Sequence, residues 1–299
     1  MRKVLVAVSA CLVVIAAPGP ASAWGTDAHR FIMGRAIDIL PAGLKPFFEH
    51  YRPELIVRAV DPDVWRNAGW DENHNHFVDF GMPELGPYPF TALPREYGAA
   101  LEKFGMTTLK KIGMLPWREA EEFGNLRRAF EGVGRGTSYA PSDVVLFSAV
   151  ASHYIQDAHQ PLHATNNYDG GLTQQNGIHA RFETALFDRF AAKLTITPGR
   201  ISAITNPRDT AFEVLLASHQ LVDQLLQADR DAIAGKDSYD DQYFDRFFAA
   251  VRPMFEKRLA DSVTATASLI VGAWEQAGKP ALRTEMPRTV QRVRGAKPE

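Results

Sequence analysis

The chain has 299 residues, of which 45% are hydrophobic and 23% are charged, and its formal net charge is −2. This mildly acidic balance argues against a general nucleic-acid-binding protein, which usually carries a basic surface. The single cysteine, Cys11, excludes an internal disulfide, so the fold must be stabilised by its hydrophobic core or by bound metal.

The first residues have the three parts of a secretory signal peptide. Two basic residues are followed by an apolar run over residues 4–17 and by the small-residue cleavage site Ala21-Ser22-Ala23. The alternative, a lipoprotein cleavage box ending at Cys11, would leave apolar residues and a second cleavage site in the mature chain. The sequence therefore predicts a signal peptide over residues 1–23 and a secreted or periplasmic protein that begins at Trp24.

Apolar residues recur with the period of a helix through most of the chain, and the alternation typical of strands is scarce. No internal repeat or low-complexity linker divides the sequence, which predicts one all-α, multi-helix domain over residues 24–279. A basic tail over residues 280–299 is expected to be flexible. Residues 52–94, rich in Pro, Gly, Asp and Asn, are expected to form an ordered loop. Helices are expected over residues 27–40, 117–130 after Pro116, 142–155 with Ser142 as N-cap, 178–192, 210–227, 243–260 and 260–276.

Histidines and carboxylates are unevenly placed along the chain. His153 and Asp157 are four residues apart on an expected helix, so both side chains project from one face, and His179 and Glu183 repeat this spacing. A single pair of this kind is usually a solvated ion pair. Two pairs that face each other in a bundle would form a metal site, and imidazole with carboxylate suits Zn²⁺, although Fe or Mn is chemically possible.

Further candidates lie on both sides of these pairs. Pro161 is expected to end the helix and to turn the His163 imidazole back toward the cluster. His159 falls on a different helical face from Asp157, and we expect it beside the site or at the surface. Upstream, the candidate ligands are His29, Asp61, Asp63, His74 and His76.

Several segments carry a resemblance to a known family. They are Ala28–Ile32, Gly34–Ile39, Ser152–Ala164, Gly177–Glu183 and the stretch from Lys257. Together they resemble the zinc-dependent bacterial phospholipases C and the related single-strand-specific zinc nucleases, over most of the chain. The His-x3-Asp-x5-His and His-x3-Glu spacings are the most specific part of the resemblance.

The resemblance implies a helical domain with a trinuclear zinc site and nine ligands. Trp24, through its free amine and carbonyl oxygen, and His29 would hold one zinc, which Asp157 would bridge to a second. His76, His153 and a loop aspartate would complete the second zinc, and His163, His179 and Glu183 would hold the third. Because the amine must be free, removal of the signal peptide would be a condition for activity.

The identity of two loop ligands is left open, because each has a neighbouring residue of the same type that could bind instead. Asp63, three residues before Arg66, looks like the nuclease pattern, but Asp61 fits nearly as well by its distance from the histidine. His76 is favoured over His74 because Phe77-Val78-Asp79 resembles the family's context after that ligand.

The implied activity is hydrolysis of phosphate esters by a metal-bound hydroxide. Asp63 would orient the water or accept its proton, and Arg66 and Asn166 or Asn167 would contact the phosphate.

Two substrate classes compete, and a third reading excludes catalysis. Glu183 and the lack of disulfides resemble phospholipase C, whereas the short spacing from Trp24 to His29 resembles the nucleases. Trp65 and Trp70 could stack a base, contact lipid or belong to the core. A di-iron bundle or a non-catalytic metal-binding protein is the remaining alternative, although a di-iron bundle would carry Glu-x-x-His pairs. The expected partners are therefore a phospholipid or single-stranded nucleic acid, with transient contact to a membrane surface, and the protein is expected to be a monomer.

Overall fold

The computed structural model describes residues 24–284, which consist of helices and loops without a strand, so the all-α prediction is confirmed. The expected signal peptide and residues 285–299 of the expected tail lie outside the described residues. The helices are α1 (Thr26–Ile39), α2 (Lys45–His50), α3 (Arg52–Arg58), α4 (Asp61–Asn67), α5 (Tyr97–Ile112), α6 (Leu115–Gly134), α7 (Ala140–Ala158), α8 (Ile178–Ala180), α9 (Leu186–Phe190), α10 (Pro207–His219), α11 (Val222–Ile233) and α12 (Asp241–Gln276).

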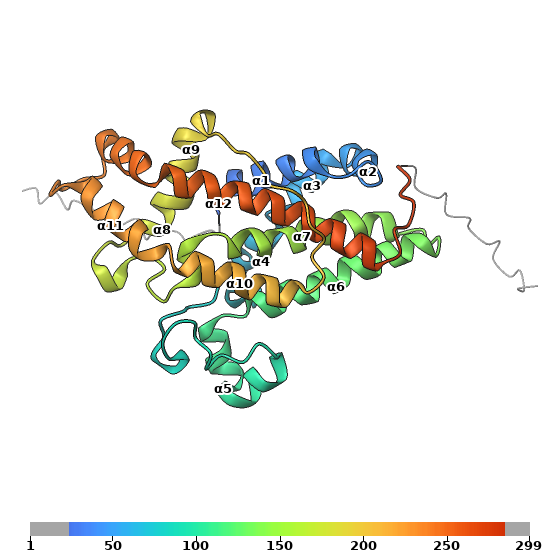
Figure 1. The fold of residues 1–299 in the computed structure, drawn as a ribbon, viewed down its shortest axis with the longest axis horizontal. Helices are drawn as coiled ribbons and strands as arrows, with labels where there is room; N and C mark the ends of the chain where they lie inside the picture. The colour runs from blue at the N-terminus through green and yellow to red at the C-terminus, as the bar shows by residue number, and fades with distance from the viewer. Residues whose placement is uncertain (1–23, 285–299) are drawn as a thin grey trace, which may run out of the picture.

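Helix α7 lies at the centre of the bundle. It contacts α1, α3, α4, α6, α10 and α12, and every residue from Ser148 to Ala158 is buried. Figure 1 shows the long α12 running beside α7, with α5 projecting away from the bundle. A helix that is covered on all sides can carry polar side chains only where they find partners, so His153 and Asp157 are conspicuous on α7.

Residues 52–94 were expected to form a loop, but the first third of this segment consists mainly of helices α3 and α4, so the prediction was wrong there. Pro53 and Pro62, which suggested a loop, stand in the first turns of α3 and α4. Proline is well tolerated there, because its fixed φ suits a helix and its missing N–H is not needed in the first turn. Beyond α4 the segment contains two short 3₁₀ turns, Asn73–Asn75 and Pro83–Leu85.

Three other expected helix boundaries were wrong. Helix α7 begins at Ala140 with Pro141 in its first turn, so Ser142 is not its N-cap. The expected helix over 210–227 is divided by a turn in which Leu221 N–H donates to Ser218 O (3.0 Å). The two helices expected to meet at Ala260 form the single helix α12, in which buried apolar residues continue through the junction.

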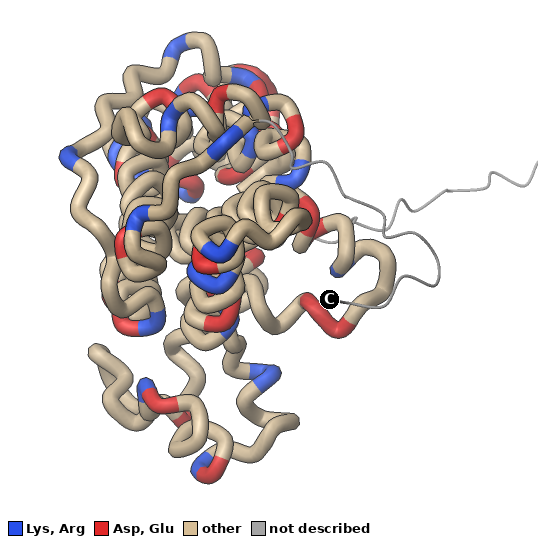
Figure 2. The backbone as a smooth tube through the Cα atoms, turned by 90° about the vertical axis from the view of Figure 1, so that its right-hand side faces the viewer, with Lys and Arg blue, Asp and Glu red and all other residues tan. Residues whose placement is uncertain are grey.

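None of the described helices is long and apolar enough to cross a bilayer. Figure 2 shows basic and acidic positions intermixed along the helices in that view. This distribution agrees with the small net charge of the sequence.

Candidate metal centre

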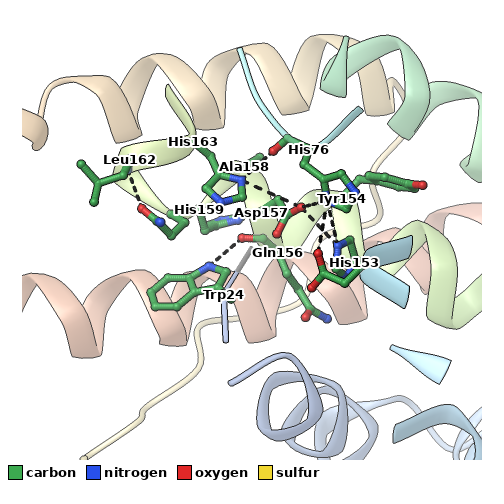
Figure 3. Close-up of polar contacts among 12 residues, drawn as sticks. Trp24, His76, His153, Tyr154, Gln156, Asp157, Ala158, His159, Leu162 and His163 are labelled. Atoms are coloured by element: carbon green, nitrogen blue, oxygen red, sulfur yellow. Dashed lines mark hydrogen bonds and ion pairs between the residues drawn. The ribbon is translucent and has the colours of Figure 1, made fainter. Parts of the chain in front are cut away.

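The Asp157 carboxylate is the centre of the first group of polar side chains. Its Oδ1 lies 3.2 Å from His29 Nε2, and its Oδ2 lies 2.9 Å from His76 Nδ1 and 3.3 Å from His153 Nε2. Figure 3 shows the His76, His153 and His163 rings around Asp157. The two oxygens therefore face different imidazoles, which is the arrangement of a bridging carboxylate.

The hydrogen bonds behind these imidazoles fix which nitrogen faces the centre. His153 Nδ1–H donates to Ala59 O (2.8 Å), and His29 Nδ1–H donates to the Gln156 side-chain oxygen (2.6 Å). The Nε2 atoms of both rings consequently point at Asp157. Burial alone would lower the pKa of His153, but the carboxylates of Asp157 and Asp63 raise it to about 9. This position therefore attracts positive charge, supplied either by a proton or by a metal ion.

His163, His179 and Glu183 form a second convergence next to the first, where His163 Nδ1 lies 3.9 Å from Asp157 Oδ2. His179 Nε2 lies 2.9 Å from Glu183 Oε2 and 3.2 Å from His163 Nε2. The helix expected over 178–192 is interrupted here, because Arg181–Ala185 forms a π turn. Such turns occur often at functional sites.

The second group provides a direct test of whether a cation fits. His163 Nδ1–H donates to His76 O (2.6 Å) and His179 Nδ1–H donates to Tyr168 O (3.0 Å). A carbonyl oxygen only accepts, so each Nδ1 carries a proton, and each Nε2 that faces the space presents a lone pair whenever its ring is neutral. Burial alone would lower the pKa of His179, but Glu183 raises it, so this position also attracts positive charge. Burial also lowers the pKa of His163 to about 3, which keeps that ring neutral. Two imidazole lone pairs and a carboxylate oxygen therefore point into one small space, as ligands of a single cation do.

Within the described residues, three sets of buried side chains have one ligand atom each within 4.8 Å of the others. They are His29, His153 and Asp157; Asp63, His76 and His153; and His163, His179 and Glu183. These sets contain eight of the nine expected ligands. The ninth, Trp24, would bind through main-chain atoms.

The structure separates the candidates that the sequence left open. Asp63 lies beside His76 (Oδ1 to Nδ1, 3.9 Å), whereas Asp61 is half-buried and pairs with Arg58 (3.2 Å). His74 faces Asp71 at 3.5 Å, away from the cluster. Asp63 and His76 are therefore the pair that the fold brings to the centre.

Trp24 is fully buried at the start of the described chain. Its indole N–H donates to Gln156 O (2.8 Å), and its ring packs against Phe182 and Phe255. The indole thus anchors this end of the chain next to Asp157.

A pocket of about 390 Å³ opens onto the cluster. Three of the expected ligands line it, together with Arg66, whose Nη2 lies 3.0 Å from Asp63 Oδ1. The pocket is lined by Arg66, Asn73, His76, Phe77, Asp79, Leu162, His163, Tyr168 and His179. Asn166 and Asn167 do not line it, and the Asn167 side chain instead accepts from Leu172 N–H (2.8 Å).

Sequence reasoning missed three polar residues at this site. Gln156 accepts from His29, and Gln160 Nε2–H donates to Glu183 Oε2 (3.0 Å), so both glutamines orient expected ligands. Asp79 lines the pocket, where burial raises its pKa to about 7. The available signal was the position of the two glutamines beside the ligand run, Gln156 next to Asp157 on α7 and Gln160 three residues before His163. His159 is also buried, but its Nδ1–H donates to Ile155 O, and it takes no part in the three sets.

The depressed pKa of His163 predicts how the metal-free protein responds to acid. Its ordinary pKa is 6.5 and its folded pKa is about 3, so the unfolded chain binds a proton that the folded chain refuses. The stability that wild type has relative to His163→Gln should be complete above pH 6.5. It should fall by about 4 to 5 kcal/mol as the pH decreases toward 3. Urea unfolding with a chelator present measures this difference, and parallel pH profiles for the two proteins would contradict the assignment.

No protein-family model matches the chain. Two phospholipase C sequences from Bacillus cereus are each 24% identical to it over 260 residues, covering 82% of this chain and 80% of the relative. Across most of its length, the chain is therefore similar to the phospholipase C of Bacillus cereus.

Proposed function

We propose that this protein is an exported, zinc-dependent phosphodiesterase of the phospholipase C type. The observation that carries the proposal is the convergence of buried imidazole and carboxylate ligand atoms at the wall of a pocket that also contains Arg66. Nitrogen and oxygen ligands of this kind suit Zn²⁺. The similarity to phospholipase C supports the reaction class.

The nine ligands are assigned to three ions. The first ion would be held by Trp24, His29 and Asp157. The second would be held by Asp63, His76 and His153, and Asp157 would bridge it to the first. The third would be held by His163, His179 and Glu183. When bound, zinc supplies Lewis acidity that lowers the pKa of water and stabilises charge on phosphoryl oxygens.

The chain's own groups would position and activate the reactants. Arg66 lines the pocket as a cation and would hold a phosphate oxygen. Burial favours the neutral form of Asp63, but the neighbouring His153, His76 and Arg66 charges together lower its pKa. Asp63 is therefore ionised near neutral pH and would accept a proton from the attacking water.

The test is a parallel assay of purified protein that begins at Trp24, with its bound metal counted. We expect two to three zinc ions per chain and hydrolysis of a phosphatidylcholine, at rates well above those on single-stranded DNA, RNA and a 3′-nucleotide. Less than one zinc per chain after purification without chelators would refute the metal site. Zinc binding with cleavage of DNA alone would instead make the protein a single-strand nuclease.

A further inference from the structure

Beside the first two sets of ligands lie a buried tyrosine and a buried carboxylate, together with a partly exposed arginine. The Tyr154 hydroxyl donates to Glu72 Oε1 (2.5 Å), and Arg118 Nε–H donates to the same hydroxyl oxygen (3.2 Å). Arg118 Nε is also 3.8 Å from the Glu72 carboxylate. Tyr154 and Glu72 are both buried.

A second trio with the same arrangement lies beside the set formed by His163, His179 and Glu183. The Tyr243 hydroxyl donates to Asp229, and Arg181 Nε–H donates to the hydroxyl oxygen of Tyr243 (3.1 Å). Arg181 Nη2 is 3.2 Å from Asp229 Oδ1. In both trios the arginine binds the phenol oxygen while the phenol proton is directed to the carboxylate, and burial raises the pKa of both tyrosines, so each hydroxyl stays a donor.

Each trio touches the segments that carry one group of ligands. Tyr154 follows His153 on α7, its ring lies 5.8 Å from that of His76, and Glu72 belongs to the loop that leads to His76. The trio of Tyr154, Glu72 and Arg118 therefore connects the loop that carries His76 to helix α7, which carries His153.

The second trio contacts the segment that carries His179 and Glu183. Arg181 is the first residue of the π turn Arg181–Ala185 and stands between His179 and Glu183 in the chain. Its Nη1 and Nη2 groups donate to the carbonyl oxygens of Asn176 (2.7 Å) and Gln175 (3.0 Å), which precede His179. Asp229 and Tyr243 therefore tie the loop and the turn of this group to α11 and α12.

We propose that the two trios are separate positioning devices, one for each group of metal ligands. Tyr154 positions His76 and His153, and Tyr243 positions His179 and Glu183, so the two groups retain their ions independently. The inference rests on the proposed function, because it assumes that these groups bind metal. Groups that orient metal ligands from behind typically change metal affinity by about 10- to 100-fold when they are removed.

Tyr154→Phe and Tyr243→Phe form a matched pair, since each deletes one buried hydroxyl that donates to a carboxylate. The zinc-loaded proteins are mixed with a chromogenic chelator, and zinc release is followed over time. His76→Ala and Glu183→Gln each remove a ligand from one group, so the phase of zinc release that each variant loses or accelerates is the phase that belongs to that group. Tyr154→Phe should accelerate release from the His76 group about tenfold or more and leave the Glu183 group unchanged, and Tyr243→Phe should do the reverse.

If a Tyr→Phe variant fails to fold, Glu72→Gln and Asp229→Asn replace it, because each keeps the size of the side chain but removes the charge that pairs with the arginine and weakens the acceptor of the phenol proton. They should show the same preference for one group. Equal acceleration at both groups, or none at either, would overturn the positioning roles while leaving the proposed function intact. A wild-type protein that holds no zinc would overturn the proposed function as well.

Discussion

Replacing Asp157 with Asn should remove the activity. We expect the two proposed zinc ions that share Asp157 to be lost, while the ion held by His163, His179 and Glu183 stays bound. Asp157 is fully buried and faces three imidazoles at 2.9 to 3.3 Å, through both of its oxygens. Asparagine preserves the shape but has no charge and only one acceptor oxygen, so it cannot balance two cations. A loss of several kcal/mol of transition-state stabilisation corresponds to a rate decrease of about a thousandfold.

Zinc counting and steady-state hydrolysis of a phosphatidylcholine measure both halves of this prediction. Asp61→Asn is the matched control, since Asp61 is the nearby aspartate that pairs with Arg58 outside the cluster. It should retain its zinc and most of its activity. An Asp157→Asn protein with full zinc content and wild-type rate would refute the bridging assignment.

The second large effect concerns the N-terminus that removal of the expected signal peptide would create at Trp24. We expect protein that begins at Trp24 to be active and protein with one added Met before Trp24 to lose at least nine-tenths of that activity. The structure anchors the Trp24 indole on Gln156 O, beside Asp157, and the proposed ligand is the α-amine of the same residue. An amide nitrogen, which an added residue would create, is a far poorer metal ligand than an amine with an ordinary pKa of about 8.

Trp24→Phe, in a chain that begins at residue 24, separates the amine from the indole. It keeps the free amine but loses the bond to Gln156 O, so we expect a smaller decrease in activity than the added Met causes. Full activity with the added Met would show that the terminal amine is not a ligand.

Much of the centre could be predicted because its ligands follow short spacings. His153 with Asp157, and His179 with Glu183, are four residues apart, so about one helical turn brings each pair together. The choice between Asp61 and Asp63 could not be made this way. They are two residues apart in the first turn of α4, and only the orientation of that turn against α7 decides which one reaches His76.

Tertiary packing explains what sequence reasoning missed. Proline gave a loop signal at Pro53 and Pro62, but the neighbouring chain lets both begin helices. Gln160 looked like an ordinary polar residue after a helix, and its role becomes visible only when Glu183 is brought within 3.0 Å. The two tyrosine trios are likewise formed between segments that no local pattern relates, as with Glu72 and Tyr154, which are 82 residues apart in the chain.

The long sequence separations within the candidate centre have a consequence for the resistance of the protein to proteolysis. His76 and Asp157 are 81 residues apart in the chain, and His29, which faces the same Asp157 carboxylate, lies still farther away in sequence. Ligands shared by one ion at such separations act as a cross-link, restricting the unfolded chain as a disulfide would. A chain with one cysteine has no such internal bond. Bound metal ions would then take the place of such a bond, and we expect a protease to cleave the metal-loaded protein far more slowly than the chelated protein.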